Sequence, residues 1–284
     1  MIKIIDAHLH LFNLEQGDYQ WLKPENQPFW PDKSLIANSF SEQDLTLTAP
    51  LALAGFVHIE AGFDNQQPWR EIAWLESSCN LPFRSIAMLD ITLSNELFLQ
   101  QLDKLTVHQS VVGIRYILDD DALDILSNNN SHKNLESLAT NKLSFELQMP
   151  LDDSQAVDCL IAILKVIPSL KVCINHAGSP AINEQGYSCW LANIKRLAMF
   201  EHVFIKCSGY EMTDRDYSLG WQHKVINHCI ESFGIERVML ASNFPLNLFR
   251  TNYQNTWLNN IKLPYDTEQL QQICFSNAQR FYLF

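Results

Sequence analysis

The sequence lacks the long apolar run that a membrane span needs, and it is poor in basic residues. No stretch reaches the roughly 18 consecutive apolar residues required to cross a bilayer. Lys and Arg number 20 against 32 Asp and Glu, which gives a formal net charge of −12. Because this charge repels nucleic acid and anionic lipid surfaces, we expect neither nucleic acid nor a membrane as a partner.

The seven cysteines are odd in number and include no C-x-x-C pair. A disulfide framework uses paired cysteines, so most of these, which lie in apolar runs, are expected to be buried reduced thiols. The first three residues lead directly into an apolar run, which leaves no room for a signal peptide. Together these features predict a cytoplasmic protein.

The chain also lacks internal repeats, low-complexity tracts and linkers, so we expect one domain over residues 1–284. A chain of this length at 47% hydrophobic residues can bury a large core. Eight short apolar runs rich in β-branched residues recur along it, at 3–6, 55–60, 84–90, 111–118, 143–149, 170–176, 202–208 and 237–242.

Segments with helical periodicity separate these runs. Helices are predicted over 68–79, 94–105, 151–166 and 266–281, the last amphipathic with Leu270, Ile273 and Phe281 on its inner face. Strand and helix alternating eight times predict a parallel sheet that is buried on both faces. The fold class is therefore α/β, a (β/α)₈ TIM barrel, with a doubly wound open sheet as the alternative.

About forty residues, 11–50, separate the first two predicted strands. Loops of this length inside a compact domain are usually functional. This one is rich in proline and aromatic residues, among them Tyr19 and Trp21, and could cover the barrel mouth and stack on a substrate. A packed structural arm or a contact within a homo-oligomer is the alternative.

The first apolar run ends in Asp6-Ala7-His8-Leu9-His10. Side chains alternate faces along a strand, so His8 and His10 should point to the same side, with Asp6 on the same parity behind them. The carboxyl ends of barrel strands carry the chemistry of barrel enzymes. His176, at the end of the sixth run, would complete the three nitrogen ligands of a catalytic zinc. We expect one divalent metal ion there, zinc, with a metal-free site as the alternative.

Polar side chains end most of the other runs. Unpaired polar groups there cost free energy unless they bind something. Arg115 and Lys206 suit an anionic group of a small-molecule substrate, although an ion pair of Arg115 with Glu60 or Glu146 is the alternative. The candidate substrate-binding residues are Arg115, Glu60, Gln148, Trp21 and Tyr19, and the candidate catalytic residues are Asn243, His176 and Lys206.

Several motifs follow one another along the chain: Asp6-x-His8-x-His10, Gly113-x-Arg115, His176-x-Gly178-x-Pro180, Lys206-x-Ser208-Gly209 and Asn277-Ala278-Gln279-Arg280-Phe281-Tyr282. In this order they resemble the amidohydrolase superfamily, and within it the amidohydrolase-related family that includes sugar lactonases and pyrone dicarboxylate lactonase. The resemblance implies a (β/α)₈ barrel that hydrolyses a lactone or a related ester or amide, with or without bound metal. The lysine or glutamate that bridges two metals in binuclear members has no counterpart at Arg115, which argues against a two-metal centre.

One position departs from the family pattern. The family typically ends strand eight in Gly-Ser-Asp-x-Pro, and the resemblance implies that this aspartate is the base that deprotonates the attacking water. Here the segment reads Ala241-Ser242-Asn243-Phe244-Pro245, and an amide does not accept a proton usefully near neutral pH. The chain is then a weak hydrolase, one with a relocated base, or no hydrolase. The candidates for a relocated base are Glu60, Glu146 and Asp6.

The leading hypothesis is a lactone hydrolase in which His8, His10 and His176 hold the metal or polarise the carbonyl directly. Asn243 would then orient the water, and Arg115 and Lys206 would bind an anionic group. A catalytically silent barrel that retains ligand binding is the first alternative. A non-hydrolytic reaction on the same site, such as decarboxylation, is the second.

Overall fold

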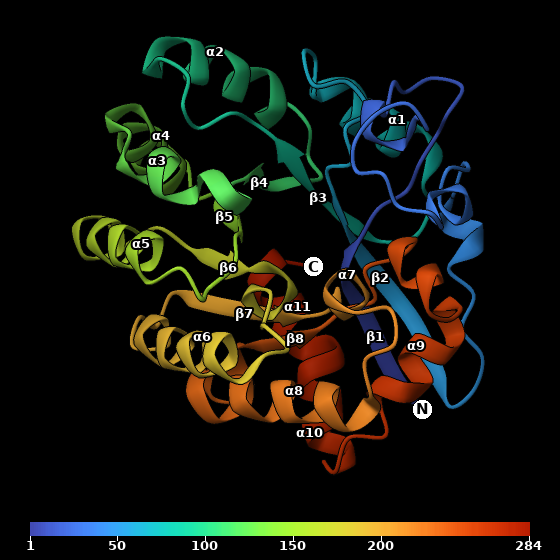
Figure 1. The fold of residues 1–284 in the computed structure, drawn as a ribbon. Helices are drawn as coiled ribbons and strands as arrows, with labels where there is room; N and C mark the ends of the chain where they lie inside the picture. The colour runs from blue at the N-terminus through green and yellow to red at the C-terminus, as the bar shows by residue number, and fades with distance from the viewer.

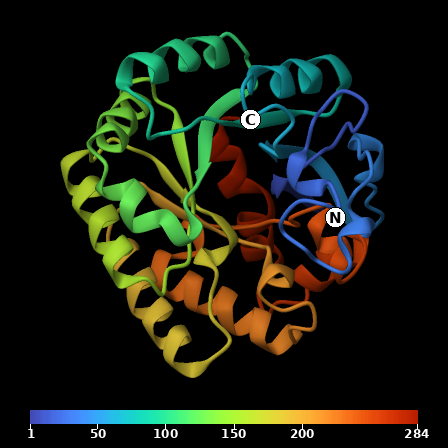
Figure 2. The same ribbon diagram turned by 45° about the horizontal axis from the view of Figure 1, so that its top comes forward.

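The computed structural model describes all 284 residues, and its strands form one parallel sheet in chain order. The sheet curls into a barrel surrounded by helices, as Figures 1 and 2 show from two directions. The predicted (β/α)₈ barrel is confirmed. Its strands are β1 (Ile2–Leu9), β2 (Leu51–Ile59), β3 (Phe83–Met88), β4 (Val111–Ile117), β5 (Ser144–Gln148), β6 (Val172–Ile174), β7 (Val203–Cys207) and β8 (Val238–Leu240).

The barrel closes between its first and last strands just beyond the end of β8. The backbone N–H of Asn243 donates to the carbonyl of His8 at 2.9 Å. The N–H of His10 donates to the carbonyl of Phe244 at 2.7 Å. These two bonds place the histidine motif directly beside the segment that carries Asn243.

Helices follow the strands and cover the outside of the barrel (Figure 2). The helix predicted over 151–166 begins at Ser154, because the Asp153 side chain caps it by accepting the N–H groups of Gln155 and Ala156. None of the helices combines the length and hydropathy that crossing a membrane requires. They are α1 (Trp69–Ser78), α2 (Asn95–Thr106), α3 (Ala122–Ser127), α4 (Asn129–Thr140), α5 (Ser154–Val166), α6 (Glu184–Leu197), α7 (Tyr210–Thr213), α8 (Leu219–Phe233), α9 (Tyr253–Asn260), α10 (Thr267–Gln271) and α11 (Asn277–Tyr282).

The predicted C-terminal helix is present but is interrupted. A π-helical turn, Gln272–Ser276, separates α10 from α11. Leu270, Ile273 and Phe281 are buried as predicted. Phe281 and Tyr282 pack with inward-facing strand residues, so α11 closes one end of the barrel interior, where Figure 2 shows it inside the ring of strands.

The prediction that Asp6 shares a face with the histidines is wrong. A β-bulge shifts the register of β1 on β2 between Asp6 and Leu9, and such a bulge reverses the alternation of side chains beyond it. Ile5 packs inside the barrel before the bulge. Asp6 therefore turns away and accepts the backbone N–H of Ser242 at 3.0 Å.

Residues 11–50 form an arm of three short 3₁₀ turns, Gln20–Leu22, Lys33–Leu35 and Glu42–Asp44. Its aromatic residues pack into a buried cluster with residues that follow β2 and β8, among them Phe12, Tyr19, Phe63 and Leu246. The Trp21 indole N–H donates to the carbonyl of Ala61 at 2.7 Å. The arm is thus fixed to the carboxyl-end side of the barrel by packing and by hydrogen bonds.

We expect Gly113→Ala to lower the free energy of unfolding by about 1–3 kcal/mol, because the new methyl group would overpack the core. A Cβ at Gly113 would lie 2.2 Å from Oγ and 2.7 Å from the carbonyl of Ser144 on the neighbouring strand. Urea titration measures the change. Gly220→Ala in α8 is the matched control, since its Cβ meets only Ser218 Oγ at 3.9 Å; it should be neutral or slightly stabilising. Equal losses in the two variants would contradict this packing argument.

Candidate active site

Three histidines from distant parts of the chain meet at the carboxyl end of the barrel. His8 lies at the end of β1, His10 just beyond it, and His176 in the turn that follows β6. The ring centroid of His8 is 5.1 Å from that of His10 and 4.4 Å from that of His176. Gly209 makes room for this packing, because a Cβ there would lie 2.3 Å from Nδ1 of His176.

The ring nitrogens of the three histidines differ in their partners. Nδ1 of His10 lies 2.8 Å from the carbonyl of Ile59, and Nδ1 of His176 lies 3.1 Å from Oγ of Ser208. Neither nitrogen of His8 has a hydrogen-bond partner, although both are buried. Burial, with smaller contributions from neighbouring cationic groups, lowers the pKa of all three and takes that of His176 to about 3. The rings are therefore neutral at pH 7.

The donor chemistry of this cluster fits a metal ion, while its ligand geometry is not formed. A metal-binding imidazole typically uses its second ring nitrogen for a protein partner, as His10 and His176 do, and the unpartnered nitrogens of His8 are suitable donors. However, no group of three His, Cys, Asp or Glu side chains has its donor atoms placed as in a metal site. Side-chain rotation would be needed to complete one.

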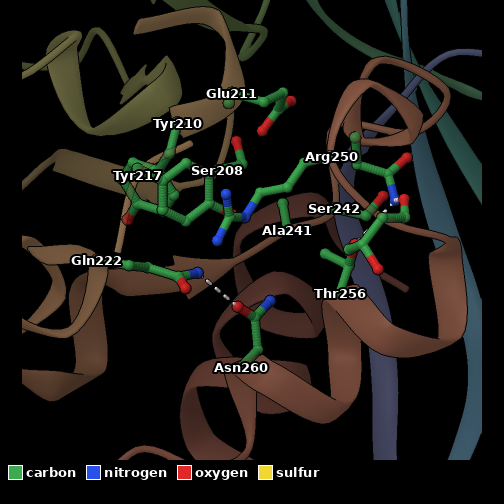
Figure 3. Close-up of a pocket in the computed structure, with 13 residues that line it drawn as sticks. Ser208, Tyr210, Glu211, Tyr217, Gln222, Ala241, Ser242, Arg250, Thr256 and Asn260 are labelled. Atoms are coloured by element: carbon green, nitrogen blue, oxygen red, sulfur yellow. Dashed lines mark hydrogen bonds between the residues drawn. The ribbon is translucent and has the colours of Figure 1, made fainter. Parts of the chain in front are cut away.

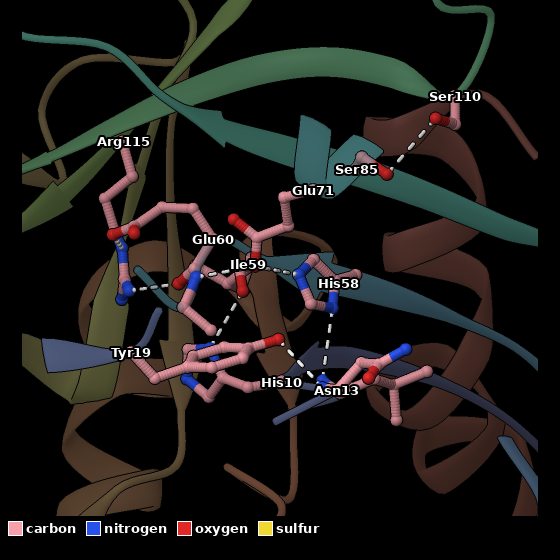
Figure 4. A network of polar contacts seen from close by, with 12 residues as sticks. His10, Asn13, Tyr19, His58, Ile59, Glu60, Glu71, Ser85, Ser110 and Arg115 are labelled. Atoms are coloured by element: carbon pink, nitrogen blue, oxygen red, sulfur yellow. Dashed lines mark hydrogen bonds and ion pairs between the residues drawn. The ribbon is translucent and has the colours of Figure 1, made fainter. Parts of the chain in front are cut away.

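Arg115 is held in a buried ion pair, one of the two arrangements that its position in a strand allows. Its Nε donates to Oε1 of Glu60 at 2.8 Å, and Nη2 donates to the carbonyl of the same residue. Nη1 donates to Oε1 of Gln148 at 2.8 Å. Figure 4 shows the guanidinium facing Glu60. Because guanidinium carries five N–H groups, two remain for a further acceptor.

Lys206 is fully buried and also paired. Its Nζ lies 2.6 Å from Oε2 of Glu146, without the angles of a hydrogen bond. The Tyr282 hydroxyl, from the last turn of α11, donates to Oε1 of the same carboxylate at 2.7 Å. The C-terminal helix therefore contributes to the interior beneath the site.

Asn243 contacts a carboxylate that the sequence reasoning missed. Its Nδ2 donates to Oε1 of Glu211 at 2.6 Å, and both side chains are buried. Asn243 Oδ1 has no partner. Glu211 lies in α7, four residues beyond the end of β7, so a search limited to the strand ends passes over it. The helical turn after the Lys206-x-Ser208-Gly209 motif was the available signal.

Two other candidates, Tyr19 and Trp21, have structural partners, and so does the neighbouring His58. Tyr19 is buried in the aromatic cluster of the arm, and its hydroxyl accepts the N–H of Asn13 at 2.9 Å (Figure 4). Trp21 is half-buried and bound to Ala61. Nε2 of His58, on β2, lies 3.0 Å from Oε1 of Glu71, and its Nδ1 accepts the N–H of Leu11. Both ring nitrogens therefore have protein partners, which indicates a structural role for His58.

The sequence motif, the barrel and the histidine cluster agree with a comparison against known families. The family model described as amidohydrolase matches residues 5–284. The chain belongs to the amidohydrolase family. A Sinorhizobium fredii protein, y4mH, is 25% identical over 297 residues, which cover 99% of this chain and 98% of that protein. The L-fucono-1,5-lactonase of Burkholderia multivorans is 29% identical over 92 residues, 28% of this chain and 31% of that enzyme.

Solved structures share the fold at low sequence identity. An amidohydrolase from Burkholderia multivorans with bound zinc superposes with a TM-score of 0.80 at 17% identity, covering 99% of each chain. The 5-carboxyvanillate decarboxylase of Sphingomonas paucimobilis superposes with a TM-score of 0.62 at 13% identity, covering 100% of this chain and 99% of that one. At these identities the likeness shows the fold of this family member and no more.

We expect Lys206→Met to destabilise the protein by about 3–5 kcal/mol, because it leaves the Glu146 carboxylate buried without a cation. Chemical denaturation at pH 7 measures the loss. The double variant Lys206→Met with Glu146→Gln should recover much of it, since no unpaired charge then remains in the interior. If the double variant were as unstable as the single one, loss of lysine packing would be the cause and not the uncompensated charge.

Proposed function

We propose that the protein is a hydrolase that opens a small lactone at the histidine cluster. The observation that carries this proposal is the set of three neutral imidazoles at the carboxyl end of the barrel, with both nitrogens of His8 unpartnered. Leaving such nitrogens buried costs free energy unless a ligand engages them. A carbonyl oxygen, or a metal ion that binds one, is a ligand of the required kind.

His8, His10 and His176 would hold one divalent metal ion, with zinc as the first candidate. Their low pKa values favour this, because only neutral imidazole binds metal. A bound ion would polarise the substrate carbonyl and make a nearby water more acidic. Zinc in the related Burkholderia structure supports the choice of ion.

The other residues would bind and orient the substrate. Arg115 has two free N–H groups and a position fixed by Glu60, so it can donate hydrogen bonds to one anionic oxygen of the substrate without moving. Lys206 is fully buried with its charge balanced by Glu146, so it would support the interior beneath the site and leave anion binding to Arg115. Asn243 Oδ1, which has no partner in the protein, would accept a hydrogen bond from the attacking water.

The metal proposal predicts about one zinc ion per chain in protein purified from zinc-supplemented cells. Elemental analysis by mass spectrometry measures it independently of activity. His8→Ala should lose most of this metal, because it removes the one ring that has no protein partner for either nitrogen. His108→Ala is the control, since His108 pairs with Glu76 away from the site. Only trace metal in the unaltered protein would refute the metal site.

The lactone proposal predicts ring opening of sugar 1,5-lactones, beginning with L-fucono-1,5-lactone, the substrate named for the partial relative. Acid release followed with a pH indicator measures the rate, and His176→Ala should lower kcat/KM at least 10²-fold through loss of carbonyl polarisation. Carboxylated lactones test whether Arg115 binds an anionic group of the substrate. Arg115→Met should then raise KM for the carboxylated substrates more than for the neutral ones.

Decarboxylation is the second candidate, since the buried arginine suits a carboxylate and the strand-eight aspartate is missing. The decarboxylase among the fold neighbours uses the same architecture. Release of CO₂ from hydroxybenzoates, without lactone opening, would favour this reaction. Binding of a lactone in calorimetry without turnover would instead favour the silent ligand-binding barrel.

A further inference from the structure

We propose that Glu211 is the general base of this site and that Asn243 is its hydrogen-bonding partner. The inference rests on the proposed lactone hydrolysis and identifies the carboxylate that replaces the missing strand-eight aspartate. The sequence around position 243 shows only that the aspartate typical of the family is absent. The structure adds a buried carboxylate in α7, four residues beyond the end of β7, whose Oε1 lies 2.6 Å from Nδ2 of Asn243.

The identity of residue 243 affects how readily Glu211 ionises. The Asn243 amide donates a hydrogen bond to the carboxylate, which favours its charged form. An aspartate at 243 would place a second carboxylate at this short distance, and two such groups share one proton because both cannot be charged. With asparagine at 243, the Glu211 carboxylate has no second carboxylate beside it with which to share a proton. The base is then Glu211, which follows β7, and not residue 243, which follows β8.

None of the other candidate carboxylates is available for this role. Glu60 is paired with Arg115 and Glu146 with Lys206, so each of these carboxylates is already bound to a cationic group. Asp6 lies on the other side of the β1 bulge and is bound to the backbone of Ser242. Glu211 is buried, forms no ion pair, and accepts its only side-chain hydrogen bond from a neutral amide.

The surroundings of Glu211 tune it for proton transfer near neutral pH. Burial raises the pKa of Glu211 to about 7. The hydrogen bond from Asn243 and the charges of Arg215 and Arg250 act in the opposite direction and limit the rise. Burial and the same carboxylate raise the pKa of Tyr217 to about 12, so this phenol stays neutral. A base is most effective when its pKa lies near the working pH.

A small polar cavity beside Glu211 has room for an ordered water. The histidines do not line it, but Ser208, which does, contacts Nδ1 of His176 through its Oγ. The volume of the cavity is about 10 Å³, close to the least that one water molecule needs. Figure 3 shows Glu211, Ser208 and Arg250 around it. The buried Gln222 Oε1 and Asn260 Nδ2, which also line the cavity, have no hydrogen-bond partners, as expected of atoms that bind ordered water.

The reaction step balances with water as the only co-reactant. The water oxygen forms a bond to the lactone carbonyl carbon while one water proton moves to the Glu211 carboxylate. The tetrahedral intermediate then breaks its ring C–O bond. The leaving alkoxide takes the proton from Glu211, which returns as a carboxylate, and the product is the ring-opened hydroxy acid.

Glu211→Gln tests the role directly, because glutamine still accepts the Asn243 hydrogen bond but does not take up the proton. We expect kcat/KM for a sugar 1,5-lactone to fall 10²–10⁴-fold, with an unchanged melting temperature. A residue that only positions Asn243 would keep its function in this variant. Glu76→Gln, at an exposed glutamate on α1, is the control and should keep full activity. Activity of Glu211→Gln within threefold of the unaltered protein would overturn the proposal.

Exchanging the amide and the carboxylate between positions 243 and 211 gives a second test. Asn243→Asp alone should not raise the rate 10²-fold, because the new carboxylate shares a proton with Glu211. Asn243→Asp combined with Glu211→Gln leaves one carboxylate and one amide again, and we expect it to recover at least tenfold over Glu211→Gln. A 10²-fold gain from Asn243→Asp alone would show that position 243 carries the base and would reject Glu211.

The pH profile gives a readout that does not depend on any variant folding. The base acts when it is ionised, so kcat/KM should fall as pH drops through about 7, where an ordinary glutamate would stay active to below 5. A flat profile from pH 8 to 5.5 would count against Glu211. Absence of any lactone turnover by the unaltered protein would instead overturn the hydrolase proposal itself, which separates the two failures.

Discussion

The two backbone hydrogen bonds that join β1 to the segment after β8 determine where the candidate site lies. They pair His8 with Asn243 and His10 with Phe244, so the first motif of the chain and one of the last become neighbours across the closing seam. The bulge in β1 then turns the histidines inward and Asp6 away. Without closure at this register, the histidine pair and the amide would face different surroundings.

Charge in the interior of the barrel is balanced locally. Arg115 is neutralised by Glu60 and Lys206 by Glu146. Buried ion pairs contribute little net stability, because desolvation offsets their attraction. Their main effect here is to fix the positions of the charged side chains. They hold the cationic groups in place while the histidines, in the same low-dielectric region, stay neutral and able to bind a carbonyl oxygen or a metal ion.

The fold was predictable because hydrophobic periodicity records which faces are buried, and eight alternating runs leave few architectures. The general position of the site followed from the same pattern. The contacts among its side chains could not be predicted in the same way. The alternating motif gives no sign of the one-residue bulge, and this bulge is why the prediction for Asp6 was wrong. Glu211 was missed because it lies in the helical turn beyond β7 and not at a strand end, and its contact with Asn243 becomes evident only in the folded chain.

The 11–50 arm connects this arrangement to the candidate base. Asp32 of the arm accepts a hydrogen bond at 2.9 Å from Nε of Arg215, whose guanidinium stacks 4.0 Å from the centroid of the Phe249 ring. Nη1 of the same arginine donates to the backbone carbonyl of Glu211. Because the guanidinium binds this carbonyl and forms no ion pair with the carboxylate, it can fix the position of Glu211 while leaving the side chain able to take up a proton. The packing of the arm thus supports, through Arg215, the residue that we propose as the base.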